Sequence, residues 1–331
     1  MTHGLNWIRA LVVMITLVMG AQLAQAMVQA AGAQEAGTQA AGQAINPTAM
    51  SVQESQLLQD ETKIQGYLAQ PDPKLAVLEQ PLGRLWRTFH EAWLPWGSGI
   101  LILATVLLLG GVYLIKGPIQ ADEVSGIKIL RFSAFERFTH WMTAVSFIIL
   151  ALSGMNYIFG KRYLMPLIGP DSFATLAQWG KYAHNFLAWP FMLGVLFMIV
   201  VWTKDNFPQR GVDWAWLKAG GGVFNNTHPS AGRFNAGQKM IFWWVALAGI
   251  AMSVTGIMLL FPFAIFGVSG MQITQVIHSV IGFLFIAVII FHIYIGTLGM
   301  EGAYDAMGTG EVDVAWARAH HDLWVEEQLR K

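Results

Sequence analysis

Two histidines lie inside an uncharged apolar run near the C-terminal end of the chain, which extends from Val276 to Leu298. A histidine in a membrane-spanning helix is costly and rare, so its presence there indicates a functional site. His278 and His292 are fourteen residues apart, which is just under four helical turns, or about 21 Å along the axis. Both imidazoles therefore lie on nearly the same side of the predicted helix, one near each membrane surface.

Two further histidines open other apolar segments, His140 in one and His184 in another. Their places predict that His140 lies at the depth of His292 and that His184 lies at the depth of His278. Two imidazoles at one depth could fill both axial positions of a haem iron, which leaves no open position for oxygen and is typical of electron transfer. Each ligand is then expected to donate its other ring N–H to a backbone carbonyl or a similar acceptor.

Two other readings of the histidines stay open. A single buried histidine is often only a hydrogen-bonded residue of a helix bundle. Four histidines at two matched depths favour cofactor binding over this interpretation. Zinc or copper is less suitable than haem iron, because each depth supplies two histidines and no carboxylate or thiol nearby.

The composition places these histidines in a membrane protein. Of 331 residues, 55% are hydrophobic and only 12% are charged, and the mean hydropathy is +0.48, far from the average of soluble domains. The absence of cysteine excludes disulfides, iron–sulfur clusters and covalent haem attachment within the chain. A net charge of zero gives no indication of nucleic-acid binding.

Five apolar segments are long enough to cross a bilayer as helices. None has the alternating pattern of a strand, so we predict an all-α membrane protein, with one N-terminal span added to a four-helix bundle that carries the histidines. The predicted spans are residues 97–115, Thr139–Phe159, Ala183–Trp202, Met240–Pro262 and Val276–Leu298.

Lysine and arginine in the connecting segments predict the orientation, because cytoplasmic loops are enriched in both. Segments 116–138 and 203–239 carry nine of them, whereas the opposite segment 160–182 carries three and 263–275 carries none. We therefore expect the first two segments and the C-terminal tail in the cytoplasm, and the mature N-terminus on the periplasmic side of a bacterial inner membrane.

The N-terminus reads as a secretory signal peptide over residues 1–26, with an apolar stretch from Leu11 to Gly20 and a cleavage site at Ala24-Gln25-Ala26. We expect residues 27–96 to form an exported arm, which starts with a stretch rich in Ala, Gln and Gly, a composition typical of disorder. An exported N-terminus agrees with the orientation obtained from the loop charges.

Several motifs surround the four histidines, namely Phe135–Trp141 (FERFTHW), Phe234–Met240 (FNAGQKM), Ile277–Gly282 (IHSVIG) and Phe291–Tyr294 (FHIY), followed by His320-His321. Together they make the chain from about Phe132 to Trp324 resemble the membrane-anchoring gamma subunit of respiratory formate dehydrogenase, a dihaem cytochrome b. The resemblance implies that His140, His184, His278 and His292 are the axial ligands of two b-type haems, in the pairs expected from depth. The arm and the first span depart from the shortest members of this family.

The resemblance also implies a quinone site and partner subunits. Asn235, Gly237 and Gln238 match the quinone pocket of the family, although Asn235 and Gln238 also fit a simple helix-capping box. Arg137, one turn before His140, could pair with a haem propionate or act as a cytoplasmic anchor. The implied partners are an iron–sulfur beta subunit and a catalytic alpha subunit, with electrons passing from the periplasmic side through both haems to quinone near the cytoplasm. The alternatives are the cytochrome b subunit of a membrane-bound nickel–iron hydrogenase and a haem-free membrane anchor or transporter.

Overall fold

The structure, a computed structural model, describes residues 82–120, 124–222 and 229–330. The predicted signal peptide at 1–26 and most of the arm at 27–96 lie outside the described residues. The part from residue 82 onward belongs to one compact unit, and the description below concerns that unit alone.

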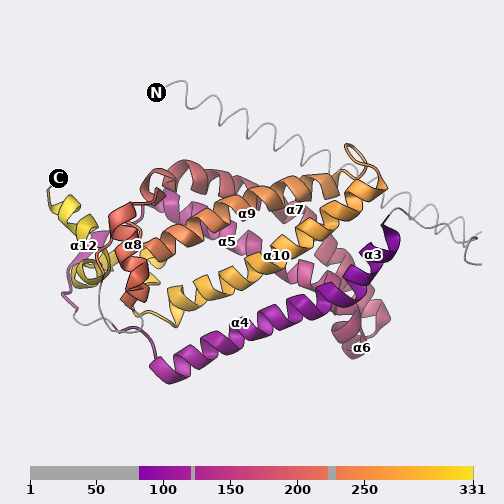
Figure 1. Cartoon of the computed structure of the whole chain (residues 1–331), viewed down its shortest axis with the longest axis horizontal. Coiled ribbons are helices and arrows are strands. Elements are labelled where there is room, and N and C mark those ends of the chain that lie inside the picture. Colours follow the sequence, from indigo (N-terminus) through magenta and orange to yellow (C-terminus); the bar gives the residue numbers. More distant parts are fainter. Residues whose placement is uncertain (1–81, 121–123, 223–228, 331) are drawn as a thin grey trace, which may run out of the picture. The chain divides into compact units, whose positions relative to one another are not determined.

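Five long apolar helices dominate the described part of the chain, which confirms the predicted all-α membrane fold. They run along a common direction in Figure 1. Each is longer than its predicted span, and the first begins fourteen residues before position 97, because polar or aromatic turns continue the helices beyond their apolar centres. The helical stretches are α3–η2–α4 (Gly83–Lys116), α5–η3–α6 (Ala134–Ile168), α7 (Pro170–Trp202), α9 (Ala236–Leu260) and α10 (Val268–Thr297).

These stretches contain shorter pieces. The first consists of α3 (Gly83–Thr88), the π-helix η2 (Phe89–Trp93) and α4 (Leu94–Lys116). The second consists of α5 (Ala134–Met155), the π-helix η3 (Asn156–Leu164) and α6 (Met165–Ile168). The turn between α6 and α7 uses Gly169 at φ 82°, a conformation that favours glycine, and Pro170 then starts α7 at a position where proline is well tolerated.

Short elements gather at the two ends of the bundle. The helices α8 (Arg210–Lys218) and α12 (Val314–Leu329) lie at one end, here named the α12 end, and α3 and α6 lie at the other, here named the α6 end (Figure 1). The remaining short elements are the 3-10 turns η4 (Lys204–Asn206) and η5 (Gly220–Gly222), the helix α11 (Asp305–Gly308) and the strands β1 (Lys128–Leu130) and β2 (Glu311–Asp313), which pair antiparallel.

Sequence signals at the helix starts are realised in the structure. The Ser133 hydroxyl accepts a hydrogen bond from the Glu136 backbone N–H, and the Glu136 side chain accepts one from the Ser133 N–H, which together form a capping box at the start of α5. Asn235 and Gln238 form the same box at the start of α9. Such reciprocal caps satisfy backbone donors that the first turn leaves open, so they fix where α5 and α9 begin.

The bundle is assembled from neighbouring pairs of helices. α5 packs against α7, α9 against α10, α7 against α9, and the additional helix α4 against α10. Close contacts at glycine join α5 to α7 at Thr143 and Gly194, and α7 to α9 at Val195 and Gly249. Small residues allow backbones to approach in this way in membrane bundles. The additional span therefore lies beside the helix that carries His278 and His292.

Candidate functional site: two histidine pairs at two depths

Near the α12 end, the bundle brings His140 of α5 together with His292 of α10. Their ring centroids are 6.1 Å apart and their planes meet at 60°. The Nδ1 atom of His140 is buried and has no hydrogen-bond partner among the described residues. The two residues that sequence depth predicted as one pair therefore face each other.

Near the α6 end, His184 of α7 faces His278 of α10 in the same manner. The ring centroids are 6.4 Å apart and the planes meet at 60°. Here each Nδ1 atom has a hydroxyl partner on a neighbouring helix: Ser153 Oγ on α5 lies 2.8 Å from His184 Nδ1, and Thr255 Oγ1 on α9 lies 2.8 Å from His278 Nδ1. Sequence reasoning did not single out these two hydroxyl residues, although each directly precedes a glycine, Gly154 or Gly256, that lies beside the same imidazole.

The spacing within each pair fits a haem iron between the rings. Two metal–nitrogen bonds of about 2 Å, plus about 1.1 Å from each nitrogen to its ring centre, give about 6.2 Å between centroids. The observed values of 6.1 Å and 6.4 Å lie on either side of this distance. Among the described residues, neither pair makes a direct imidazole–imidazole hydrogen bond. Within the same residues, no group of three or more His, Cys, Asp or Glu side chains could hold a metal ion without a macrocycle.

An aromatic layer lies between the two histidine pairs. Phe147 follows His140 by seven residues on α5, Phe191 follows His184 by seven on α7, and Phe285 stands midway between His278 and His292 on α10. The Phe285 ring lies 4.7 Å from that of Phe147 and 6.2 Å from that of Phe191, and Phe285 is only 1% exposed. Seven residues are close to two helical turns, so these rings stack on the same inner faces as the histidines.

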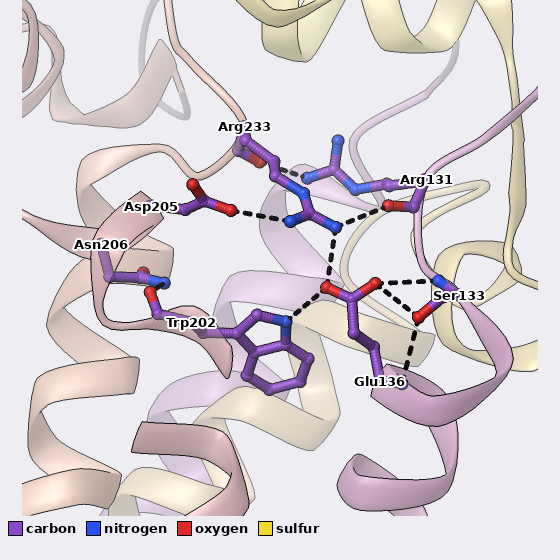
Figure 2. Close-up of polar contacts among 7 residues, drawn as sticks. All are labelled: Arg131, Ser133, Glu136, Trp202, Asp205, Asn206 and Arg233. Carbon is purple, nitrogen blue, oxygen red and sulfur yellow. Dashed lines mark hydrogen bonds and ion pairs between the residues drawn. The ribbon is translucent and has the colours of Figure 1, made fainter. Parts of the chain in front are cut away.

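A buried polar network holds the α12 end in place around His140. Glu136 lies one turn before His140. Its carboxylate oxygen Oε1 accepts a hydrogen bond from Trp202 Nε1 at 2.8 Å and forms an ion pair with Arg233 Nη2, also at 2.8 Å. Figure 2 shows Arg233 also reaching Asp205 and the Arg131 carbonyl. The network therefore connects the start of α5, the end of α7 and the segment that leads into α9.

The tail helix α12 is anchored to this network through His321, which the sequence left without an explanation. His321 is 1% exposed, its Nδ1–H donates to the Gly232 carbonyl at 2.9 Å, and its Nε2 accepts from Arg131 at 2.9 Å. Burial, followed by the positive charge of Arg131, lowers the pKa of His321 well below its ordinary value. Burial and the nearby Arg233 lower the pKa of Arg131 itself to about 9. His321 is thus a neutral docking residue rather than a metal ligand of either pair.

The segment Asn235–Lys239, which the sequence matched to a quinone pocket, lies at the α12 end. The Asn235 side-chain oxygen and the Gln238 side-chain oxygen are both occupied by the capping box. Their amide N–H groups are not used by the box and remain donors. Trp216 of α8 covers Gly237, where an added Cβ would lie 2.9 Å from the indole ring. Lys239 is buried and pairs with Asp213 of α8 at 2.9 Å, so α8 is held against the start of α9.

Arg137, the proposed propionate partner, lies between α5 and the tail. Its Nη1 donates to the Gly308 carbonyl at 3.0 Å, and its Nε is buried without a hydrogen-bond partner among the described residues. The guanidinium therefore keeps part of its hydrogen-bonding capacity unused.

Known proteins resemble this chain over the region that carries the site. The family model described as prokaryotic cytochrome b561 matches residues 131–310, more than half of the chain. The formate dehydrogenase cytochrome b556(fdo) subunit of Escherichia coli K12 is 30% identical over 203 residues, which cover 60% of this chain and 92% of the relative. The nitrate-inducible cytochrome b556(Fdn) subunit of the same organism is 29% identical over 204 residues, covering 60% and 91%.

A third relative, the formate dehydrogenase cytochrome b556 subunit of Haemophilus influenzae, is 27% identical over 208 residues, covering 61% of this chain and 84% of its own length. The family model covers His140, His184, His278 and His292 with their surrounding helices. The chain is therefore a haem-binding, multi-pass membrane protein. It belongs to the prokaryotic cytochrome b561 family, as a cytochrome b subunit of formate dehydrogenase.

Proposed function

We propose that this subunit binds two b-type haems, one between His184 and His278 and one between His140 and His292. The observation that carries the proposal is the pair of facing imidazoles at each depth, 6.1 Å and 6.4 Å apart. The bound haems would supply one-electron transfer along the bundle, from an iron–sulfur partner at the α6 end to a quinone at the α12 end. The chain's own residues hold the rings, exclude water between them and set the tautomers of the ligands.

The proposed orientation puts the α12 end in the cytoplasm of a bacterial cell and the α6 end in the periplasm. It is supported by the nine lysines and arginines of segments 116–138 and 203–239. Quinone reduction would then take up protons from the cytoplasm. Movement of negative charge inward opposes about 2.3 kcal/mol per charge for each 100 mV of membrane potential, so the step would conserve energy.

The proposed partners are an iron–sulfur beta subunit and a catalytic alpha subunit that oxidises formate, as the names of the relatives suggest. Those names favour formate dehydrogenase over the nickel–iron hydrogenase alternative. The proposed domain order is a signal peptide at 1–26, an exported arm at 27–96, an additional span at 97–115 and the cytochrome domain at 132–324.

The proposed quinone site consists of the donors of Asn235 and Gln238 with Gly237 between them. The nearby pairing of Lys239 with Asp213 fixes α8 against this segment. We also propose that the free Nε–H of Arg137 is directed to a haem propionate at the α12 end, since a guanidinium suits a carboxylate.

The direct test is the haem content of the purified complex. Two b-type haems per chain are expected from a pyridine haemochrome assay, together with a reduced-minus-oxidised spectrum in the b-type region. A spectrum without that band would overturn the proposal and favour the haem-free anchor. Copurification of a formate-oxidising subunit, rather than a hydrogenase, tests the choice of partner.

A further inference from the structure

The hydrogen bonds of the two histidine pairs differ, and the difference is confined to the Nδ1 side of the rings. At the α6 end, both His184 and His278 have a hydroxyl partner at 2.8 Å. At the α12 end, His140 Nδ1 is buried and has no hydrogen-bond partner among the described residues.

The direction of these hydrogen bonds follows from the single proton of each hydroxyl. Ser153 Oγ donates to the backbone carbonyl of Ile149 at 2.7 Å, so it can only accept from His184 Nδ1. Thr255 Oγ1 donates to the Ala251 carbonyl at 2.7 Å, so it likewise accepts from His278 Nδ1. Both imidazoles at the α6 end therefore carry their proton on Nδ1. Their Nε2 lone pairs are left for a metal.

The surrounding helices hold both hydroxyl groups in place. Ser153 is 8% exposed and Thr255 is 7% exposed, and each is tied back to the preceding turn of its own helix. The same arrangement occurs twice, as Ser153-Gly154 on α5 against His184 and as Thr255-Gly256 on α9 against His278. In both copies the glycine lies beside Cε1 of the ring, where an added Cβ would be 3.7 Å or 3.6 Å away.

An acceptor on the distal N–H makes a ligating imidazole more basic, and a more basic ligand favours the oxidised metal. We propose that Ser153 and Thr255 are positioning residues for the haem near the α6 end, and that they give this haem a lower midpoint potential than the haem held by His140 and His292. This inference rests on the proposed function. A lower midpoint potential for the haem at the α6 end than for the haem at the α12 end would favour electron transfer from the α6 end to the α12 end.

The test uses the intact complex in detergent or nanodiscs, with Ser153→Ala, Thr255→Val and the double variant. Potentiometric titration of the haem absorbance is expected to show the lower of the two midpoint potentials rising in each single variant and rising further in the double variant. The higher potential is expected to stay unchanged. Ser153→Thr and Thr255→Ser retain the acceptor and are expected to restore values close to those of the native complex.

The matched control is Ser253→Ala, because the Ser253 hydroxyl also donates to a carbonyl one turn back, that of Gly249, and belongs to the same helix as Thr255. Its two potentials are expected to be those of the native complex. If Ser153→Ala loses the haem, Ser153→Cys replaces it as the test variant, because a thiol is a weaker acceptor at the same place. The lower midpoint potential is then expected to rise in Ser153→Cys. A lower potential that stays constant, or a shift confined to the higher one, would overturn the inference.

Failure of the proposed function would look different. The native complex would then contain fewer than two haems per chain, before any variant is compared. With two haems present and both potentials insensitive to the hydroxyls, the haem assignment would stand and only the positioning role would be lost.

Discussion

The imidazoles of His140 and His292 face each other across 6.1 Å, although they come from the second and the fifth membrane helix. The capped start of α5 fixes the position of His140. His292 lies about one and a half turns before the end of α10. The pair therefore depends on the packing of the whole bundle rather than on a local motif.

The first prediction concerns the loss of one ligand from this pair. His140→Ala is expected to lower the haem content from two per chain to one and to abolish quinone reduction, because His292 alone cannot fill both axial positions. The spectrum of the remaining haem is expected to match that of the α6-end site. His90→Ala is the control, since His90 bonds only locally, to the Trp86 carbonyl, and both haems should remain. Loss of both haems in His140→Ala would contradict two independent sites.

The second prediction separates capping from quinone binding. Asn235→Asp and Gln238→Glu keep the side-chain oxygens that close the capping box but remove the amide donors. Loss of one hydrogen bond to a quinone carbonyl is worth about 1.4 kcal/mol, so the KM for quinone is expected to rise about tenfold. Thermal stability should stay nearly constant. Gln328→Glu, an exposed change of the same charge on α12, should leave KM unchanged; a native KM in the first two variants would remove these residues from the site.

The third prediction concerns the buried network of Figure 2. Glu136→Ala leaves Arg233 and Trp202 Nε1 without their carboxylate, and breaking such a partly buried pair is expected to cost about 2–4 kcal/mol of stability. Denaturant or thermal unfolding in detergent measures the loss. Glu326→Ala removes an exposed ion pair with Arg330 and is expected to change stability by less than about 0.5 kcal/mol. Equal effects of the two variants would show that the network does not stabilise the fold.

The fourth prediction is a pH dependence of tail docking. Burial and Arg131 hold the pKa of His321 below its ordinary value in the docked state, so the undocked tail binds more protons as the pH falls. Docking is therefore complete above about pH 6.5 and weakens as the pH falls below it. The protection factors for amide hydrogen exchange in residues 314–329, which correct for the intrinsic slowing of exchange at low pH, are expected to fall between pH 7 and pH 5.

Two variants identify the titrating group. His321→Gln can still accept from Arg131 and donate to Gly232, and it is expected to remove the pH dependence. The charged neighbours Arg131 and Asp322 remain in place in this variant. His320→Gln is expected to retain the dependence. The opposite pattern would assign the titration to His320.

The length and pattern of the apolar segments predicted most of the fold. Long apolar segments are sufficient to predict spanning helices, and each of the five predicted spans overlaps one of the five long helices. The five helix starts and the end of the second helix were placed too far inward, because Pro170, Asn156 and the turns near Phe89 continue the helices through polar or aromatic sequence. The predicted end at Trp202 was correct, and those at Pro262 and Leu298 lie one or two residues beyond the observed ends. The short β1–β2 ladder could not be predicted, since it joins three residues of a loop to three residues of the tail.

The candidate site was predicted in part. Depth alone grouped the histidines into the two pairs that face each other in the structure. Ser153 and Thr255 were missed, because a hydroxyl in a helix most often bonds only its own backbone, and only the bundle reveals the imidazole on its other side. The role of His321 was missed for a similar reason: its partners Arg131 and Gly232 are distant in sequence.

The layer of Phe147, Phe191 and Phe285 has a consequence for the movement of protons. Three packed benzene rings offer no donor or acceptor to a file of water molecules, whereas electrons can tunnel across such a short apolar gap. With the two proposed haems bound, the seven-residue spacing that places these rings between the histidine pairs would let the bundle conduct electrons while blocking protons. A membrane potential built up by charge transfer would not drain away through the same helices.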